Sequence, residues 1–165
     1  MAEALPWAEE TLDLAETTGH TDLLLAAHMG ACGCYCFAGE FRKGLQHANR
    51  VLELYDAEQY RHVADILNHD PKTFAGIFGS ISTWMLGYPD RALRLNDEKD
   101  AHARRRGHPF DLGLALSLGV HEFDRGWEPQ DLRKRAEECE RLVHRFRGTD
   151  QLCLIPEAAL HVVAA

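Results

Sequence analysis

The chain of 165 residues has no apolar run that approaches the roughly 20 residues a membrane-spanning helix needs. Its first residues also lack the basic and apolar blocks of a secretion signal. We therefore expect a cytoplasmic protein without a membrane partner.

Cysteine is scarce, and its odd total of five argues against a disulfide framework. Cys32, Cys34 and Cys36 share one predicted helix, where neighbours two apart point away from each other, so we expect them to pack as small side chains rather than to share a metal ion.

Basic residues are also in short supply. The chain has 18 lysines and arginines against 26 acidic residues, a formal net charge of −8. Seven acidic residues precede the first basic one, Arg42. Because affinity for a phosphate backbone rests on basic side chains that displace counterions, this balance argues against a nucleic-acid partner. Anionic membrane surfaces are disfavoured for the same reason.

The sequence lacks the motifs of the common catalytic sites. It has no glycine-rich phosphate loop ending in Gly-Lys-Ser/Thr. His121 and Glu122 begin like the helix of a zinc protease, but position 125 is arginine, so the second histidine that would chelate zinc is missing. Cys34 has no sequence-specified base beside it. We therefore predict no enzymatic activity, no metal and no cofactor.

Two polar groupings leave an alternative open. His62 and His69 lie near Asp65 and Asp70 in one long connection, where a pH-sensitive or metal-binding cluster is conceivable, although a solvated loop is the favoured interpretation. The run 104–106 consists of three arginines, which would complement the negative end of a helix dipole. Contact with an acidic peptide is the alternative for this run.

The chain contains a repeated sequence motif. Gly39, Gly87 and Gly126 are each followed by an aromatic residue one or two positions later and by a leucine six positions later. Before each glycine lies a stretch of mostly small and apolar residues, and after it comes a charged amphipathic stretch. The pattern predicts a helix, a tight turn and a second helix each time. A unit of two helices and a turn that recurs along the chain is typical of helical-hairpin solenoids, which expose a surface for binding.

The repeat predicts the helix boundaries. We expect an all-α fold, a tetratricopeptide-like right-handed solenoid of antiparallel helical hairpins, with about three full hairpins and a half-repeat at each end. Residues 1–165 would form one helical-repeat domain, a piece of a longer protein. Gly19 and Gly107 are expected to close helices, and residues 56–70 to form a longer connection. The predicted helices cover 1–20, 22–37, 41–55, 71–85, 89–106, 109–124 and 129–146.

The first helix of each hairpin carries a stripe of large apolar residues. In right-handed stacks these helices line the inner wall, so the stripe predicts a concave face that binds a partner. Packing between adjacent hairpins is the alternative role for such a stripe. The residues predicted to contact the partner are Phe37, Phe74, Ile77, Trp84, Met85, Val120 and Phe123.

Three phrases carry a resemblance to a known family: Leu54-Tyr55-Asp56, Leu86-Gly87-Tyr88-Pro89-Asp90 and Gly107-His108-Pro109-Phe110. They resemble the tetratricopeptide-like C-terminal region of large bacterial proteins that also carry nucleotide cyclase and ATPase domains, or of related ATP-binding transcriptional regulators. The chain departs from the repeat consensus at Gly44 and Asp131, where alanine is usual. The resemblance implies a regulatory arm that senses a partner and passes its state to catalytic modules elsewhere.

Together these observations predict a non-enzymatic regulatory module of a signalling protein. Its partner would be a protein, a peptide or a neighbouring domain of the same polypeptide. Two alternatives remain open. The chain could be a self-associating scaffold whose end helices stack between copies, forming a homo-oligomer, or a sensor whose groove binds a small molecule.

Overall fold

A computed structural model describes residues 4–56, 69–118 and 129–145. These residues form seven helices and no strand, which confirms the all-α class. The expected turn at Gly126 lies outside the described residues. The helices are α1 (Ala4–Thr18), α2 (Thr21–Phe37), α3 (Phe41–Leu54), α5 (Pro71–Met85), α6 (Pro89–Arg106), α7 (Pro109–Ser117) and α8 (Pro129–Arg145).

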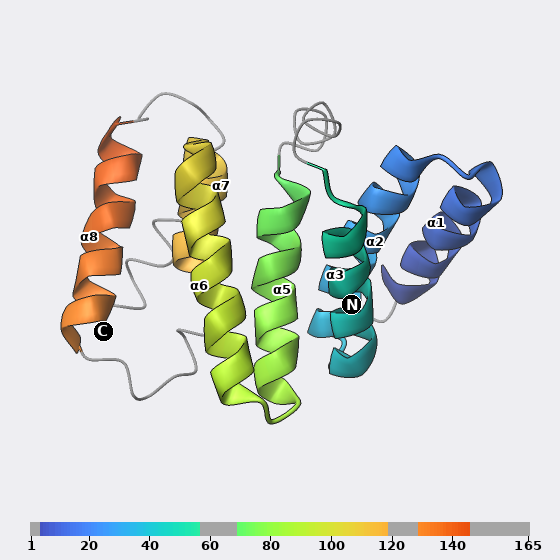
Figure 1. Ribbon diagram of the computed structural model, residues 1–165, viewed down its shortest axis with the longest axis horizontal. Coiled ribbons are helices and arrows are strands. Elements are labelled where there is room, and N and C mark those ends of the chain that lie inside the picture. The colour runs from blue at the N-terminus through green and yellow to red at the C-terminus, as the bar shows by residue number, and fades with distance from the viewer. Residues whose placement is uncertain (1–3, 57–68, 119–128, 146–165) are drawn as a thin grey trace.

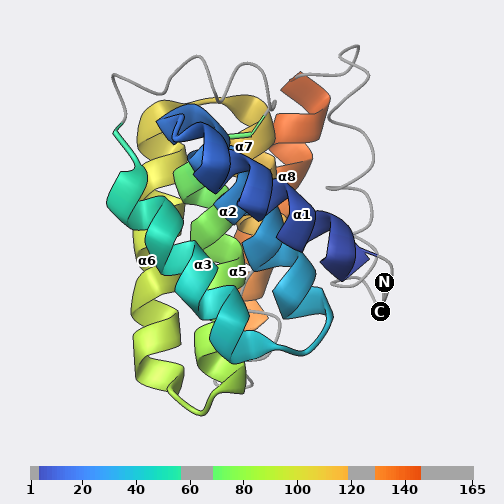
Figure 2. The same cartoon turned by 90° about the vertical axis from the view of Figure 1, so that its right-hand side faces the viewer.

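Helices that follow one another in the chain lie beside one another in space. Figure 1 shows them side by side from α1 at one end to α8 at the other. α2 packs against α1, α3 and α5, and α5 packs against α3, α6 and α7. Viewed from the α1 end, α3 and α6 lie on one side of α2 and α5 (Figure 2). The described helices therefore form two layers, with α2 and α5 in one and α3 and α6 in the other.

The same turn joins α2 to α3 and α5 to α6. Gly39 and Gly87 have φ angles of 81° and 89°, in the left-handed region that favours glycine. The N–H of Gly39 donates to Cys36 O and the N–H of Glu40 donates to Tyr35 O, a Schellman motif that satisfies the last carbonyls of α2. Gly87 and the residue after it repeat both bonds at the end of α5. This equivalence confirms the two repeated turns that lie within the described residues.

Two apolar clusters hold the helices together. The larger one joins α2, α3, α5 and α7, with Leu25, Val51 and Ile77 fully buried at its centre. The smaller one lies between α1 and α2. It is built mainly from alanines, so α1 rests closely on α2 but buries little area.

Gly44 lies where α3 approaches α2 and α5 closely. A Cβ atom at this position would lie 3.0 Å from Ser82 Oγ and 3.3 Å from Cys36 N. Alanine would therefore force α3 away from α2 and α5. The glycine permits a closer approach of three helices than alanine would allow.

α7 is shorter than the sequence predicts. The apolar pattern indicated a helix over 109–124, but α7 ends at Ser117, and Leu118 is extended with φ −119° and ψ 138°. Lys99 of α6 supplies the physical reason, because its Nζ donates to Ala115 O at 2.6 Å and to Leu118 O at 2.8 Å. A buried ammonium thus takes carbonyls that a longer helix would have used internally. Residues 119–128 lie outside the described residues.

Candidate interaction surface

The structure separates the seven residues predicted to contact a partner. Phe37 and Met85 are exposed, at 61% and 50% of their surface. Phe74 and Trp84 are half-buried. Ile77 is 0% exposed and lies in the larger core cluster, so in this structure it presents no surface to a partner. The other two predicted residues, Val120 and Phe123, lie outside the described residues.

The stripe of α5 that reaches the surface is offset from the predicted one. Phe74, Phe78, Ile81 and Met85 follow one another at spacings of four, three and four, which places them on one face of the helix. Phe78 is buried, whereas the other three keep some exposed surface. The predicted stripe through Ile77 turns instead toward the core, because α5 is covered by neighbours on most of its sides.

A ladder of aromatic rings connects this face of α5 to α2 and α7. The ring centroids of Phe37 and Phe78 are 5.2 Å apart, and those of Phe78 and Phe74 are 4.7 Å apart. His69 continues the ladder, with its ring 5.8 Å from Phe74 and 5.1 Å from Phe110. Such spacings are those of favourable aromatic pairs. The ladder therefore shows that the exposed Phe37 of α2 belongs to the same surface as the apolar face of α5.

The surface continues onto the exposed face of α2. Leu23, Gly30 and Phe37 are all exposed and recur every seven residues, so they lie along one line of the helix. A Cβ atom at Gly33 would lie 3.4 Å from the ring of Phe74, which shows how closely α2 and α5 approach. At Gly30 a Cβ atom would meet nothing within 4 Å, so this part of the line is open.

α1 adds two large apolar side chains. Trp7 is 70% exposed and Leu14 is 63% exposed, although the helix buries Ala8, Leu12 and Ala15 against α2. Tyr35 OH donates to Glu9 Oε1 at 2.8 Å, and the Tyr35 ring stacks on His47 of α3, so the Glu9 flank of α1 lies toward α3. Trp7 lies about 200° around the helix from Glu9, on the other flank. Trp7 and Leu14 therefore lie on the side of the α2 and α5 face.

We call the combined surface the apolar wall. Three of its members were not predicted from the sequence: Trp7 and Leu14 of α1, which fall outside the stripe that α1 buries, and Leu23 of α2. The seven-residue spacing of Trp7 and Leu14 was the signal that could have found those two. The apolar wall comprises Trp7, Leu14, Leu23, Phe37, Phe74, Ile81, Met85 and Phe110.

A buried polar network lies at one end of the stack. Asp70, fully buried, caps α5 by accepting from the Thr73 N–H at 2.9 Å. The same carboxylate accepts from Tyr55 OH at 2.8 Å and from His102 Nε2 at 2.8 Å. Burial by itself raises the pKa of Asp70, but the bonds from His102, Thr73 and Tyr55 outweigh it and lower the pKa to about 2. The network joins α3, α5 and α6, and its buried position suits a structural role.

The same network reaches α7. The backbone N–H of Asp70 donates to Asp111 Oδ1 at 2.9 Å. Arg106 Nε lies 3.4 Å from Asp70 Oδ1 and 3.6 Å from Asp111 Oδ2, between the two carboxylates. The arginine at 106 thus pairs with buried acids at the end of its own helix.

The histidine and aspartate cluster considered in the long connection does not form among the described residues. His69 stacks between two phenylalanines, whereas Asp70 bonds to His102. His62 and Asp65 lie outside the described residues. Within the part of the chain that the structure describes, no three histidine, cysteine, aspartate or glutamate side chains are grouped so that they could hold a metal ion.

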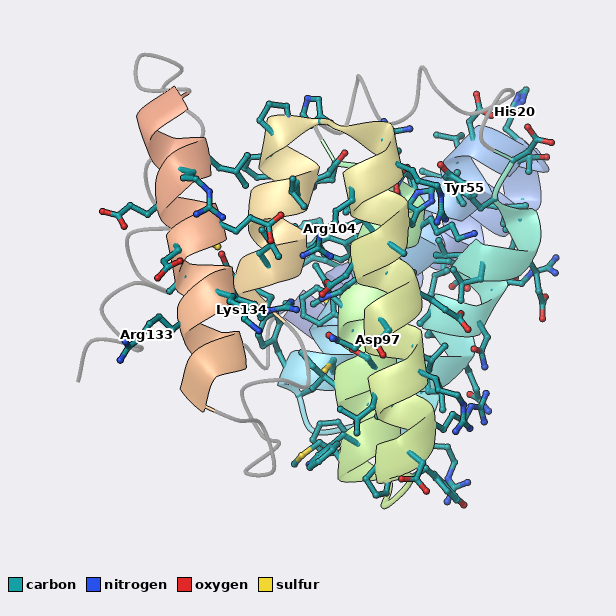
Figure 3. The ribbon with its side chains drawn as sticks, turned by 60° about the vertical axis from the view of Figure 1, so that its left-hand side comes forward. His20, Tyr55, Asp97, Arg104, Arg133 and Lys134 are labelled. Carbon is teal, nitrogen blue, oxygen red and sulfur yellow. The ribbon has the colours of Figure 1, made fainter. Side chains whose placement is uncertain are left out.

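A second polar cluster joins α6 to α8. Lys99 Nζ lies 3.0 Å from Asp100 Oδ1, and Arg135 Nη1 donates to Asp100 Oδ2 at 2.5 Å. Arg104, which points toward the α7 and α8 side in Figure 3, donates to Glu138 Oε2 at 2.9 Å. Burial lowers the pKa of Lys99 to about 8, against the opposing effect of Asp100. Since the Lys99 ammonium is fully engaged by carbonyls and a carboxylate, the cluster braces helices rather than presenting a nucleophile.

The cysteines of α2 and the histidine pair between α2 and α3 also have structural surroundings. Burial raises the pKa of the Cys32 and Cys36 thiols, which suits the packing role predicted for them. His28 Nδ1 lies 2.9 Å from His47 Nδ1 of α3, and burial lowers the pKa of both rings. Neutral imidazoles can share one hydrogen between these nitrogens, which ties α2 to α3.

Comparison with protein-family models, curated proteins and solved structures finds no match to this chain. The resemblance to the repeat region of cyclase- and ATPase-linked proteins therefore stays a prediction. So do the cytoplasmic location and the absence of enzymatic activity. Among the described helices, none is long and apolar enough to cross a membrane.

Proposed function

We propose that this chain is a helical-repeat interaction module that binds an amphipathic helix of a partner protein on the apolar wall. The observation that carries the proposal is the line of exposed large apolar side chains shared by α1, α2 and α5. Single exposed apolar residues are ordinary on a protein surface, but a contiguous set commonly marks an interaction site. A helix laid in such a place would present side chains at spacings of three and four residues.

We further propose that the hairpins α2–α3 and α5–α6 are two units of a tetratricopeptide-like right-handed solenoid. Support comes from their identical turns at Gly39 and Gly87 and from the layer that α2 and α5 share. In such a stack the apolar wall is the surface lined by first helices. A regulatory role within a cyclase- or ATPase-linked protein is the context that best fits a module of this kind.

The test uses a designed probe, a fluorescent peptide of about 18 residues, or about 27 Å as a helix. It carries leucines along one face and glutamines elsewhere, so that only its apolar stripe can be recognised. Binding is measured by fluorescence anisotropy. We expect Phe37→Ser and Met85→Ser each to weaken binding by about 1.4 kcal/mol, or tenfold in Kd, because each removes a partly exposed apolar side chain from the contact.

The control is Arg94→Ala, at an exposed position of α6 in the other layer. This variant should bind the peptide as the unchanged protein does. A probe that shows no binding, or binding that both wall variants leave intact, would refute the proposed function. Light scattering on the same samples separates the self-association alternative, which predicts oligomers that grow with protein concentration.

A further inference from the structure

The α1 end of the apolar wall differs in charge from the rest. α1 contains four acidic residues, Glu9, Glu10, Asp13 and Glu16, and no basic one. All four are exposed. Tyr35 bonds to Glu9, whereas within the described residues Glu10, Asp13 and Glu16 take part in no ion pair. The helix therefore presents unneutralised negative charge to solvent.

One of these carboxylates lies beside the apolar side chains. Glu10 is three residues after Trp7 and four before Leu14, so it is a surface neighbour of both. Asp13 is three residues after Glu10 and continues the acidic line along the helix. A partner that covers Trp7 and Leu14 must therefore approach the Glu10 carboxylate at close range, with Asp13 farther around the helix.

Helix stability does not account for this charge. Acidic side chains stabilise a helix in its first turn, but the first turn of α1 has none. Glu16 lies near the end of α1, where the helix dipole disfavours negative charge. Asp13 also has like charges three and four residues away, at Glu10, Glu16 and Glu9, which repel it. The acidic line opposes the isolated helix and would be relieved by cations from outside.

We propose that the partner helix is basic, with lysines or arginines on the flank that faces α1 and an apolar stripe that covers Trp7, Leu14 and Leu23. This inference rests on the proposed function of the apolar wall and specifies the chemistry of its occupant. Complementary charge selects the partner and its orientation, because a cationic flank fits over α1 and an anionic one is repelled. A second copy of the chain fits poorly, since it would bring another acidic α1 or an overall charge of −8 to the same place.

The experiment compares three peptides that share one leucine stripe and carry glutamine, lysine or glutamate on their polar face. We expect the lysine peptide to bind at least tenfold more tightly than the glutamine peptide at low salt, and the glutamate peptide to bind more weakly than both. The preference should shrink as the ionic strength rises, because the exposed charges are screened within about 10 Å at 0.1 M salt. Trp7→Ser should weaken the binding of every peptide that binds measurably.

Charge reversal locates the effect. The double variant Glu10→Lys/Asp13→Lys should reduce the lysine peptide's advantage to less than twofold and leave the glutamine peptide unaffected. The matched control, Asp97→Lys/Glu98→Lys, makes the same change in net charge at exposed positions of α6, in the other layer. It should keep most of the preference. All of these positions are exposed, so circular dichroism should show unchanged folding.

The outcomes separate this inference from the proposed function. If the glutamine peptide binds through Phe37 and Met85 but the lysine peptide has no advantage, the basic partner is refuted and the wall remains. If the α6 control abolishes the preference as fully as the α1 variant does, net charge rather than α1 selects the peptide, and the inference fails. If no peptide depends on the wall residues, the proposed function itself fails.

Discussion

Asp70→Asn tests whether the buried network at the end of the stack stabilises the fold. The substitution keeps the size of the side chain and an oxygen that can still cap α5, since asparagine is as good an N-cap as aspartate. It removes the negative charge that His102, Thr73 and Tyr55 surround. The change in stability therefore reports the ionised carboxylate rather than the loss of packing.

The size of the expected loss in stability follows from the pKa of Asp70. A fall from the ordinary value of 3.8 to about 2 means that the folded state favours the ionised carboxylate by about 2 kcal/mol at neutral pH. The amide nitrogen of asparagine also replaces an acceptor that Arg106 faces, which adds a smaller loss. We expect Asp70→Asn to lower the free energy of unfolding by about 2 to 3 kcal/mol at pH 7.

The stability that Asp70 contributes should fall as the pH is lowered. Because folding lowers the pKa of Asp70, its contribution is complete above about pH 4 and is lost as the pH falls through the folded-state value near 2. Urea unfolding followed by circular dichroism at pH 7, 5 and 3 measures this. The gap between the unchanged protein and Asp70→Asn should stay constant from pH 7 to 5. It should narrow by about 1 kcal/mol between pH 5 and 3.

The control is Asp97→Asn on α6, an exposed position in the middle of a helix. It should change stability by less than about 0.5 kcal/mol at every pH. The reasoning would be refuted by an Asp70→Asn variant within about 0.5 kcal/mol of the unchanged protein at pH 7. A gap that stays the same down to pH 3 would also refute it, because the charge would then not be the stabilising feature.

Two other predictions concern the packing of α5, α6 and α7. Gly76→Ala should destabilise the fold by about 1 to 3 kcal/mol in urea unfolding, because the new Cβ would lie 2.8 Å from Lys99 Cβ. Gly30→Ala should stabilise the fold by about 0.5 to 1 kcal/mol, because alanine favours the helix and its Cβ would meet nothing within 4 Å. Equal effects at the two glycines would contradict the close approach of α5 and α6. Lys99→Met should cost about 3 kcal/mol at pH 7 in the same assay, because Asp100 and the carbonyls at the end of α7 lose a buried partner. A loss under about 1 kcal/mol would show that Lys99 does not hold that end of α7.

Local chemistry made the helix boundaries predictable. Gly39 and Gly87 end helices because a left-handed residue closes the Schellman turn, and glycine adopts that conformation without steric cost. Pro71 and Pro89 begin α5 and α6, where proline's missing N–H has no partner to lose. These effects act over a few residues, so the sequence alone was enough to place α5 and α6.

The candidate surface was predictable only in part. Phe37 and Met85 were predicted as part of the apolar stripe of the first helices, and both are exposed. Ile77 was assigned to the same surface, yet it is buried, because helical periodicity shows which residues share a face but not which neighbour covers that face. The position of Trp7 on this surface follows only from the contact between Glu9 and Tyr35, which shows how α1 is rotated on α2.

Residue types and their short-range spacing were sufficient to predict the helical class, the two glycine turns within the described residues and the acidic character of the first helix. Three features could be read only from the packed helices: where α7 ends, which stripe of α5 is exposed, and the hydrogen bonds that Asp70 accepts from Tyr55 and His102. These features depend on side chains far apart in the chain. Lys99 reaches carbonyls 16 and 19 residues away, and His102 reaches a carboxylate 32 residues away, distances over which no local pattern specifies the partner.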